Sequence, residues 1–226
     1  MNIAIIPARG GSKRIPRKNI KLFHGKPMIA YSIEAAHLSG CFDEVIVSTD
    51  DQEIADIAIQ YRAEAPFLRP AKIADDFATT MDVMQHAINW CLEQKWSVDK
   101  VCCIYATAPF ILPEYIKQGL QSVSAENVEY AFSATTFPFA IQRAISLDKS
   151  GSVNMFSPEY ANTRSQDLEE AYHDAGQFYW GKASAFLTGK AIFSEHSKAV
   201  VLPRKRVLDI DTPEDWELAE YLFGAL

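Results

Sequence analysis

The chain is poor in cysteine, and its cysteines do not have the spacing of a metal site. The four thiols of Cys41, Cys91, Cys102 and Cys103 include no Cys-x-x-Cys pair and no histidine at zinc spacing. A disulfide framework and a structural zinc site are therefore not expected. No apolar stretch approaches the ~20 residues of a membrane-spanning helix. The opening MNIAIIPARG places its apolar run before its charges, the reverse of a signal peptide. We expect a cytoplasmic protein without a membrane partner.

Two familiar nucleotide-binding motifs are also missing. The chain has no Gly-x-Gly-x-x-Gly, and Gly25-Lys26 lacks the glycine five residues earlier that a Walker-type phosphate loop requires. A dinucleotide-dependent dehydrogenase is therefore disfavoured. A net charge of −7 and a pI near 5.3 argue against a nucleic-acid partner, because phosphate backbones need a broad basic face.

Acidic residues are absent from the first 33 positions, although the chain as a whole is acidic. The bases before Glu34 are Arg9, Lys13, Arg14, Arg17, Lys18, Lys21 and Lys26. Gly10 and Gly11 lie among them, directly after an apolar run, and glycines let backbone N–H groups approach an anion. A solvated basic loop is the alternative interpretation. The coincidence of glycines, strand end and charge favours a site for a small polyanion.

Apolar strands alternate with amphipathic helices along most of the sequence. Its 226 residues, 48% of them hydrophobic, suffice for a single domain spanning 1–226. We expect strands at 2–7, 44–49, 101–106, 129–135, 199–203 and 207–211, and helices at 27–40, 50–63, 79–94, from 113, from 182 and from 212. Thr49 or Asp50 is expected to cap the helix at 50–63. This alternation predicts an α/β fold with a Rossmann-like, mostly parallel sheet and helices on both faces.

Residues 137–180 interrupt the alternation. Short extended pieces at 143–148 and 152–157 flank a Lys-Ser-Gly turn and predict a hairpin. The polar stretch 159–176 predicts a long loop or a protruding arm. Long ordered loops in compact domains tend to be functional, so this inserted segment is a candidate interaction element.

Five sequence blocks, in order, resemble those of one enzyme family. ARGGSKRIPRKN, STD, LRPAKIADDFATT, ATAPF and LDIDTPED run from residue 8 to residue 215. Together they resemble cytidylyltransferases that activate nine-carbon 2-keto acid sugars, the family of CMP-sialic acid synthetases. The resemblance implies a nucleotidyltransferase-type fold and attack of a sugar hydroxyl on the α-phosphate of CTP, with release of pyrophosphate. Family members usually dimerise by extending an arm over the partner's active site, which implies a homodimer through residues 137–180.

The resemblance also implies which residues bind the nucleotide. The implied nucleotide-binding set is Arg9, Gly10, Gly11, Lys13, Lys18, Asn19, Arg69 and Thr80. Arg9 and Lys13 would contact the triphosphate and, with Asp211, form the catalytic set. A nucleotidyl transfer needs mainly positioning and charge neutralisation. The general base is left open between Asp211, a metal-bound water and the substrate's own carboxylate.

Two aspartates alternate near the end of the chain. On a strand, Asp209 and Asp211 would project from one face while Ile210 points away. Paired carboxylates suit Mg²⁺, which binds through one or two carboxylates plus substrate phosphates. Helix capping is the alternative; it explains Thr212 and Asp215 but does not require Asp209. We expect Mg²⁺ as the cofactor, held by the two aspartates.

The half of the sequence expected to bind the acceptor departs from the sialic acid pattern. Tyr105 precedes ATAPF where those enzymes usually carry glutamine, and HDAGQ at 173–177 stands where they commonly read R-P-N-G-A. Within the family the chain most resembles enzymes acting on pseudaminic acid. The expected acceptor-binding set is Tyr105, Thr107, Arg164, His173, Gln177 and Tyr179. Phe139, Phe178, Tyr179 and Trp180 are candidates for an apolar wall, with burial in the core as the alternative.

Alternatives stay open for the acceptor and for the function. The arm arginine, Arg164, offers a planar fork that suits a sugar carboxylate, and it is also compatible with an ordinary surface loop. Sialic, legionaminic and octulosonic acids are alternative acceptors. A non-catalytic nucleotide-binding protein of the same fold is the more distant alternative, disfavoured by the presence of both Asp209 and Asp211 beside the full basic loop.

Overall fold

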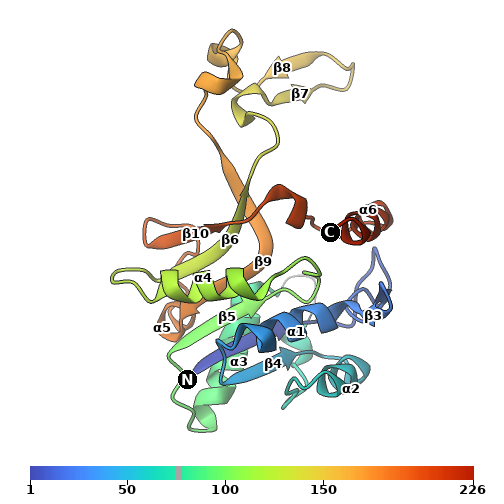
Figure 1. Cartoon of the computed structure of the whole chain (residues 1–226), viewed down its shortest axis with the longest axis vertical. Helices are drawn as coiled ribbons and strands as arrows, with labels where there is room; N and C mark the ends of the chain where they lie inside the picture. Colours follow the sequence, from blue (N-terminus) through green and yellow to red (C-terminus); the bar gives the residue numbers. More distant parts are fainter. Residues whose placement is uncertain (75–77) are drawn as a thin grey trace.

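A mixed six-stranded sheet forms the centre of the molecule (Figure 1). The computed structural model describes residues 1–74 and 78–226. The strands of this sheet are β1 (Asn2–Pro7), β4 (Glu44–Ser48), β5 (Lys100–Ile104), β6 (Tyr130–Thr136), β9 (Tyr172–Lys182) and β10 (Ser197–Val201), in the spatial order β10-β6-β9-β5-β1-β4. β1 runs parallel to β4 and β5, and β10 runs parallel to β6. β9 lies antiparallel between β5 and β6, so the sheet is mixed.

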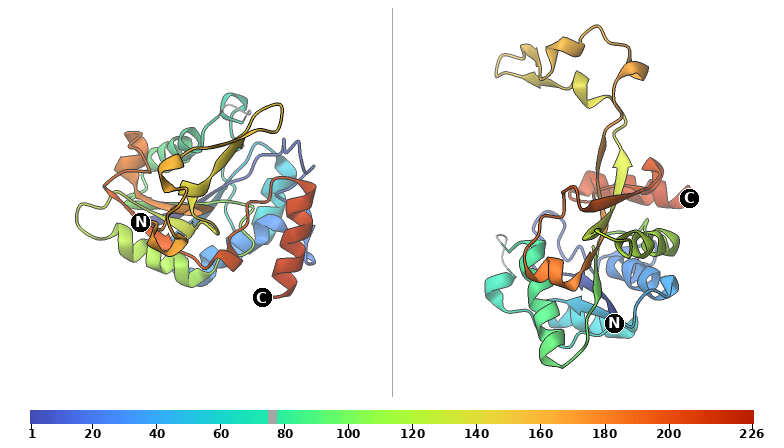
Figure 2. Two further views of the ribbon diagram at one scale, coloured as in Figure 1. Left: turned by 90° about the horizontal axis from the view of Figure 1, so that it is seen from above. Right: turned by 90° about the vertical axis from the view of Figure 1, so that its left-hand side faces the viewer.

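Helices cover both faces of this sheet (Figures 1 and 2). The helices are α1 (Met28–Ser39), α2 (Gln52–Gln60) and α4 (Pro113–Val123) on one face, and α3 (Thr80–Glu93) and α5 (Ala183–Leu187) on the other. In β1, Ala4 and Ile6 pack toward the first group, whereas Ile3 and Ile5 pack toward the second. Burial on both faces explains the unbroken apolar run of β1. The expected α/β fold is confirmed.

The C-terminal helix α6 (Pro213–Gly224) packs beside the sheet rather than on it. Its Trp216 joins a separate cluster with Phe23 and Met28, next to the small hairpin of β2 (Leu22–Phe23) and β3 (Lys26–Pro27). This cluster places α6, and the residues just before it, beside the basic loop that follows β1. Across the described parts of the chain, none of the helices combines the length and the apolar character needed to cross a membrane.

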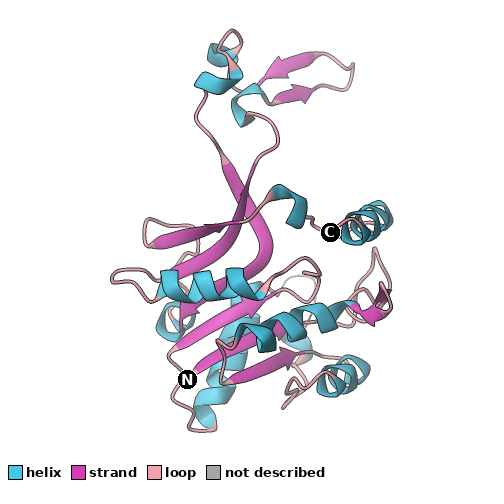
Figure 3. Cartoon of the chain, in the orientation of Figure 1, coloured by secondary structure: helices cyan, strands magenta, loops and turns pink. Residues whose placement is uncertain are grey.

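The segment between β6 and β9 protrudes as an arm (Figure 2). At its end β7 (Ile145–Leu147) and β8 (Val153–Met155) pair as an antiparallel hairpin, as the sequence predicted. Figure 3 shows that two loop segments connect this end of the arm to the sheet. The arm carries exposed apolar side chains, including Phe139 at 83% exposure and Phe156.

Three local predictions were wrong. Residues 207–211 form no strand: Ile210 packs into the α6 cluster, and its carbonyl accepts a hydrogen bond from Lys18 rather than from a neighbouring strand. Residues 172–176, expected in a loop, belong to β9, because pairing with β6 overrides their polar character. The N-cap of α2 is Asp51, whose carboxylate accepts the Ile54 N–H at 3.1 Å.

Candidate active site

A cavity of about 330 Å³ lies at the carboxyl ends of β1 and β5. The basic loop after β1, residue 69, residues 73–74, residues 78–80 at the start of α3, and the loop after β5 line it. It brings together Arg9, Lys13, Lys18, Asn19, Arg69, Thr80, Tyr105, Thr107 and Asp211 from the expected site residues. Ligands in open α/β sheets bind at this end of the strands, so the cavity is the candidate active site.

Asp211 meets the basic loop directly, although 193 positions separate it from Lys18. The Lys18 ammonium lies 3.1 Å from Asp211 Oδ1 and donates to the Ile210 carbonyl at 2.7 Å. Arg14 Nη2 lies 2.7 Å from Asp211 Oδ2. Arg14 also lines the cavity. The sequence analysis assigned it no separate role, because every base of the loop was a candidate. Cationic and anionic groups thus share one wall of the cavity, as a site for a phosphate with a metal ion requires.

Asp209 lies next to this wall without lining the cavity. The pKa of Asp209 is raised above its ordinary value. Partial desolvation is the largest cause, and repulsion from the Asp211 carboxylate is the second. A divalent cation relieves such repulsion, so the two carboxylates fit Mg²⁺. Within residues 1–74 and 78–226, no group of three or more His, Cys, Asp or Glu side chains could hold a metal ion. The donor set therefore suits an ion whose other ligands are phosphate oxygens and water.

The two glycines of the basic loop do not line the cavity. The Gly10 N–H donates to Asp50 Oδ1 at 3.0 Å, and a Cβ on Gly10 would lie 2.6 Å from Asp51 Oδ2. Gly11 has open space where its Cβ would be. In this structure Gly10 therefore permits close approach of the loop to the turn between β4 and α2, whereas the sequence had suggested contact with a phosphate for both glycines.

Arg17 fastens the basic loop to the same turn, a role that sequence reasoning missed. Its guanidinium binds Asp51 through two hydrogen bonds, of 2.5 and 3.1 Å, and also contacts Glu53. The hydrogen bond from Arg17 is the largest cause of the lowered pKa of Asp51. Arg17 has φ of 56°, a left-handed conformation that non-glycine residues adopt infrequently. The pairing of Arg17 with Asp51 is apparent only in the structure, because the two residues are 34 positions apart in the sequence.

Two buried polar side chains, Arg69 and Asn19, line the cavity near the basic loop and the turn between β4 and α2. Arg69 is 6% exposed; its backbone N–H donates to the Thr49 carbonyl at 2.7 Å, and its guanidinium lies 3.7 Å from Asp50. Its Nε has no hydrogen-bond partner among the described residues, and burial lowers the pKa of Arg69. Asn19 donates to the Arg9 carbonyl at 2.9 Å and so holds the loop from within. An unsatisfied buried donor beside a cavity favours an acceptor on the ligand.

Tyr105 lies at the neutral end of the cavity, backed by Tyr179. Its hydroxyl is 3.3 Å from Thr80 Oγ1, and its ring packs against that of Tyr179 with centroids 5.3 Å apart. Tyr179 is buried and does not line the cavity; its hydroxyl donates to Asp174 Oδ2 at 2.5 Å. Burial raises the pKa of both tyrosines, which therefore act as neutral hydroxyl groups.

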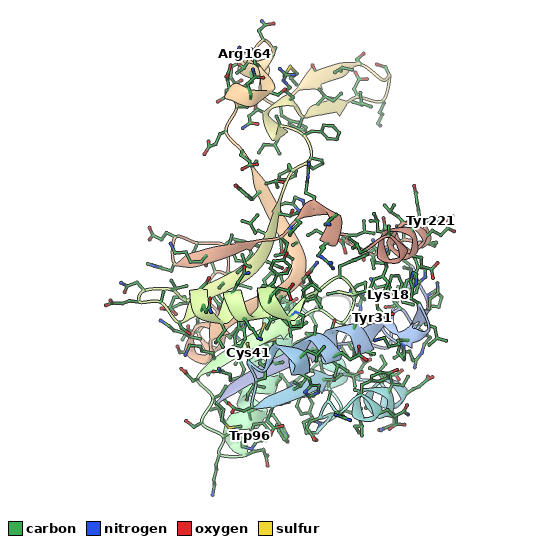
Figure 4. The ribbon with its side chains drawn as sticks, viewed as in Figure 1. Lys18, Tyr31, Cys41, Trp96, Arg164 and Tyr221 are labelled. Carbon is green, nitrogen blue, oxygen red and sulfur yellow. The ribbon has the colours of Figure 1, made fainter. Side chains whose placement is uncertain are left out.

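The remaining expected acceptor residues lie outside the cavity. Arg164 is at the end of the arm, far from Lys18 in Figure 4, and binds Asp167 at 2.7 Å. His173 packs on Phe137 at the base of the arm. Gln177 is buried, and its amide donates to the Arg206 carbonyl at 2.5 Å.

The proposed apolar wall is wrong for this cavity. Phe178 and Trp180 are buried in the core of the sheet, and Phe139 is exposed on the arm. The alternation of β9 decides this, because neighbouring residues of a strand point to opposite faces. Tyr179 faces the Tyr105 side of the sheet, and its two aromatic neighbours face the side of α1 and α4.

Comparisons with known proteins agree with this geometry. A family model described as Cytidylyltransferase matches residues 3–222. The chain is 49% identical over 222 residues to a pseudaminic acid cytidylyltransferase of Campylobacter jejuni, covering 98% of this chain and 96% of the relative. It is 37% identical to a CMP-N,N'-diacetyllegionaminic acid synthase of Legionella pneumophila, covering 97% and 95%.

A solved structure shows the same fold at lower identity. The structure of CMP:2-keto-3-deoxy-manno-octonic acid synthetase complexed with CTP aligns with a TM-score of 0.72 and 18% identity, covering 99% of this chain and 98% of that one. Because the family model spans nearly the whole sequence and the cavity lies within it, the chain belongs to the cytidylyltransferase family.

Proposed function

We propose that this protein transfers CMP from CTP to pseudaminic acid and releases pyrophosphate. The observation that carries the transfer chemistry is the convergence of the basic loop and Asp211 on one cavity. The pseudaminic acid assignment is supported by the 49% identity to the Campylobacter jejuni enzyme over nearly the full length of both chains.

The nucleotide would bind with its triphosphate on the basic side of the cavity. Arg9 and Lys13 line this side and supply countercharge to the phosphates. Arg69, with a buried Nε lacking a partner in the described chain, and Asn19 are suited to the nucleoside portion. Charge neutralisation and alignment provide most of the catalysis in this class of reaction.

Asp209 and Asp211 would hold Mg²⁺. The ion would neutralise charge on the phosphates and on the pyrophosphate that leaves. Arg14 and Lys18, which contact the Asp211 carboxylate, lie where they would also supply countercharge to the phosphates.

The acceptor would enter from the side of Tyr105 and Thr107. One of its hydroxyl oxygens forms a bond to the α-phosphorus, the bond from that phosphorus to the bridging α–β oxygen breaks, and pyrophosphate leaves with the bond electrons. The hydroxyl proton goes to a base, for which Asp211, a metal-bound water and the sugar carboxylate are the candidates. His173 and Gln177 belong to the same strand as Tyr179 and are proposed to shape the acceptor side.

We propose further that the enzyme is a cytoplasmic homodimer. Arg164 lies at the end of the arm, away from the cavity of its own chain, and would meet the acceptor carboxylate only in a partner's site (Figure 4). The exposed apolar side chains of the arm favour burial against a second copy. Light scattering should report a dimer for the intact chain and a monomer after residues 138–171 are replaced by a short linker. A monomeric intact chain contradicts this part of the proposal.

The reaction is tested by measuring pyrophosphate release from CTP with a panel of acceptors. Pseudaminic acid should give the highest kcat/KM. At limiting Mg²⁺, Asp211→Asn should lower turnover at least about a hundredfold, because it removes a metal ligand. Asp56→Asn is the control: it removes the same charge from an exposed position of α2, outside the cavity, and should keep most of the activity. Unchanged turnover in Asp211→Asn contradicts the metal site.

Legionaminic acid is the second candidate acceptor, favoured by the 37% identity to the Legionella pneumophila enzyme. The same acceptor panel decides between the two. A higher kcat/KM for legionaminic acid overturns the pseudaminic acid assignment and leaves the cytidylyl transfer intact.

A further inference from the structure

The segment that carries Asp209 and Asp211 does not belong to a strand, so no ladder of backbone hydrogen bonds fixes it. Before the two aspartates, the side-chain amide of Gln177 donates to the Arg206 carbonyl at 2.5 Å, three residues ahead of Asp209. After them, the Asp211 N–H donates to the Asp215 carboxylate at 3.1 Å, in the capping box of α6. The position of the two aspartates therefore depends on side chains that hold the segment at its ends.

An irregularity of β9 directs the Gln177 side chain. The pairing of β6 with β9 is interrupted at Ser133, where residues 175–178 of β9 lie opposite this one residue. The Ser133 hydroxyl accepts the N–H groups of Gln177 and Phe178, both at 3.1 Å, and so replaces the interrupted ladder. Gly176, with φ of 62°, provides the left-handed turn of the chain inside this bulge. Bulges re-aim side chains next to active sites, and the side chain at this bulge contacts the segment of the two aspartates.

The amide of Gln177 is poorly suited to a role in the core alone. Gln177 is 3% exposed, and its Oε1 is buried without a hydrogen-bond partner among the described residues. An unpaired buried amide oxygen costs stability, and an apolar side chain of the same size would avoid that cost. The bond to the Arg206 carbonyl is what the amide provides and an apolar side chain cannot, because a carbonyl only accepts hydrogen bonds.

The backbone of Gln177 contacts another wall of the cavity. Its carbonyl accepts the Tyr105 N–H at 2.9 Å, just after the end of β5. Tyr105 lines the cavity, whereas Gln177 does not. Lys18 also holds the aspartate segment, through the Ile210 carbonyl, but Lys18 lines the cavity and is proposed to serve the phosphates. Gln177 is therefore a buried, neutral support that connects the segment of the aspartates to the proposed acceptor side.

We propose that Gln177 is a positioning residue for the metal site: its amide fixes the backbone at Arg206 and so holds Asp209 and Asp211 in place for Mg²⁺. The inference rests on the proposed metal site and deepens it. Gln177 touches neither the ion nor a substrate, and acts through the backbone between Arg206 and the aspartates. Loss of its amide should therefore weaken binding of the ion, beyond any effect on the fold.

Gln177→Met tests this role, because it nearly keeps the length of the side chain and removes the amide donor. The measurement is the rise in the thermal unfolding midpoint when Mg²⁺ is added to the protein at a fixed, high concentration of CTP without an acceptor acid. The dependence of this rise on Mg²⁺ concentration gives an apparent dissociation constant for the ion. The constant should increase about tenfold in Gln177→Met, since groups that orient metal ligands contribute at least that much to metal affinity. Asp209→Asn should lose most of the rise.

Two further variants separate positioning from a structural role. Gln177→Asn keeps an amide, but its side chain is one methylene shorter and no longer reaches Arg206, so it should match Gln177→Met. Gln85→Met is the matched control: it removes a bond of the same kind, from a glutamine amide to the Phe186 carbonyl at 2.9 Å, at a position that does not line the cavity. It should lower the midpoint without metal and keep the wild-type constant for Mg²⁺. In turnover, the half-saturating Mg²⁺ concentration should rise in both Gln177 variants, with a smaller change in kcat at saturating Mg²⁺.

The outcomes separate this inference from the proposed function. Wild-type constants for Mg²⁺ in both Gln177 variants, with the rise lost in Asp209→Asn, overturn the positioning role and leave the metal site standing. If Asp209→Asn keeps the full rise, the ion binds elsewhere, and the proposed metal site and this inference both fail. If the wild type turns over no acid with CTP, the proposed function fails, and the unfolding measurements still decide the role of Gln177.

Discussion

Arg17 affects stability in two ways: its side chain binds Asp51, and its backbone has an unfavourable left-handed conformation. Two substitutions measure these contributions separately. Arg17→Ala and Arg17→Gly both remove the two hydrogen bonds to Asp51. The side chains are 38% and 23% exposed, so solvent screens the pair, and its loss costs about 1 kcal/mol in the free energy of unfolding. At φ of 56°, alanine keeps a left-handed cost of about 1–2 kcal/mol that glycine avoids. Glycine also has more conformational freedom in the unfolded chain, and this offsets about half of the stability gained by avoiding the left-handed cost.

Arg17→Ala should therefore be about 1 kcal/mol less stable than wild type, with Arg17→Gly between the two. For a chain of this length the first change corresponds to about 2–4 °C in Tm. Urea unfolding followed by circular dichroism measures both variants. Both should also raise the KM of CTP several-fold and leave the KM of the acid unchanged, because the loop is proposed to bind the triphosphate. Asp51→Asn, which keeps a good N-cap but loses the charge, should match them in KM. An alanine variant as stable as wild type, or an unchanged KM for CTP in all three, refutes the reasoning.

Two further predictions concern stability. Gly119→Ala should lower the free energy of unfolding by about 2 kcal/mol, because its Cβ would lie 2.5 Å from Cδ1 of the buried Trp180. Gly11→Ala is the control, because the position of its Cβ is open space. It should change the free energy of unfolding, measured by urea titration, by less than about 0.5 kcal/mol. Asp215 has a lowered pKa, first because the Thr212 hydroxyl donates to it. Its stabilising effect is present above the unfolded pKa of about 3.9 and is lost as pH falls through the lower folded value. Asp215→Asn should therefore show a smaller loss of stability than wild type between pH 5 and pH 3, and equal slopes contradict this.

The cationic part of the site could be predicted because its residues are close together in the sequence. The basic loop directly follows β1, and a loop at the end of a strand in an α/β sheet faces the ligand side. Arg9 and Lys13 line the cavity as expected. The residues that bind the acceptor were harder to predict from the sequence. Arg164 and His173 belong to the arm and its base, and both lie outside the cavity of their own chain.

The sequence alone determined the alternation of strands and helices and the location of the cationic loop, since both arise from the periodicity and composition of neighbouring residues. Only the tertiary structure decided that β9 lies antiparallel between β5 and β6, which places Tyr179 behind Tyr105 and buries Trp180 on the opposite face. It also decided that Arg14 and Lys18 meet Asp211, and that Arg17 meets Asp51. These pairings depend on which distant segments the packing of the core brings together, and no local pattern specifies them.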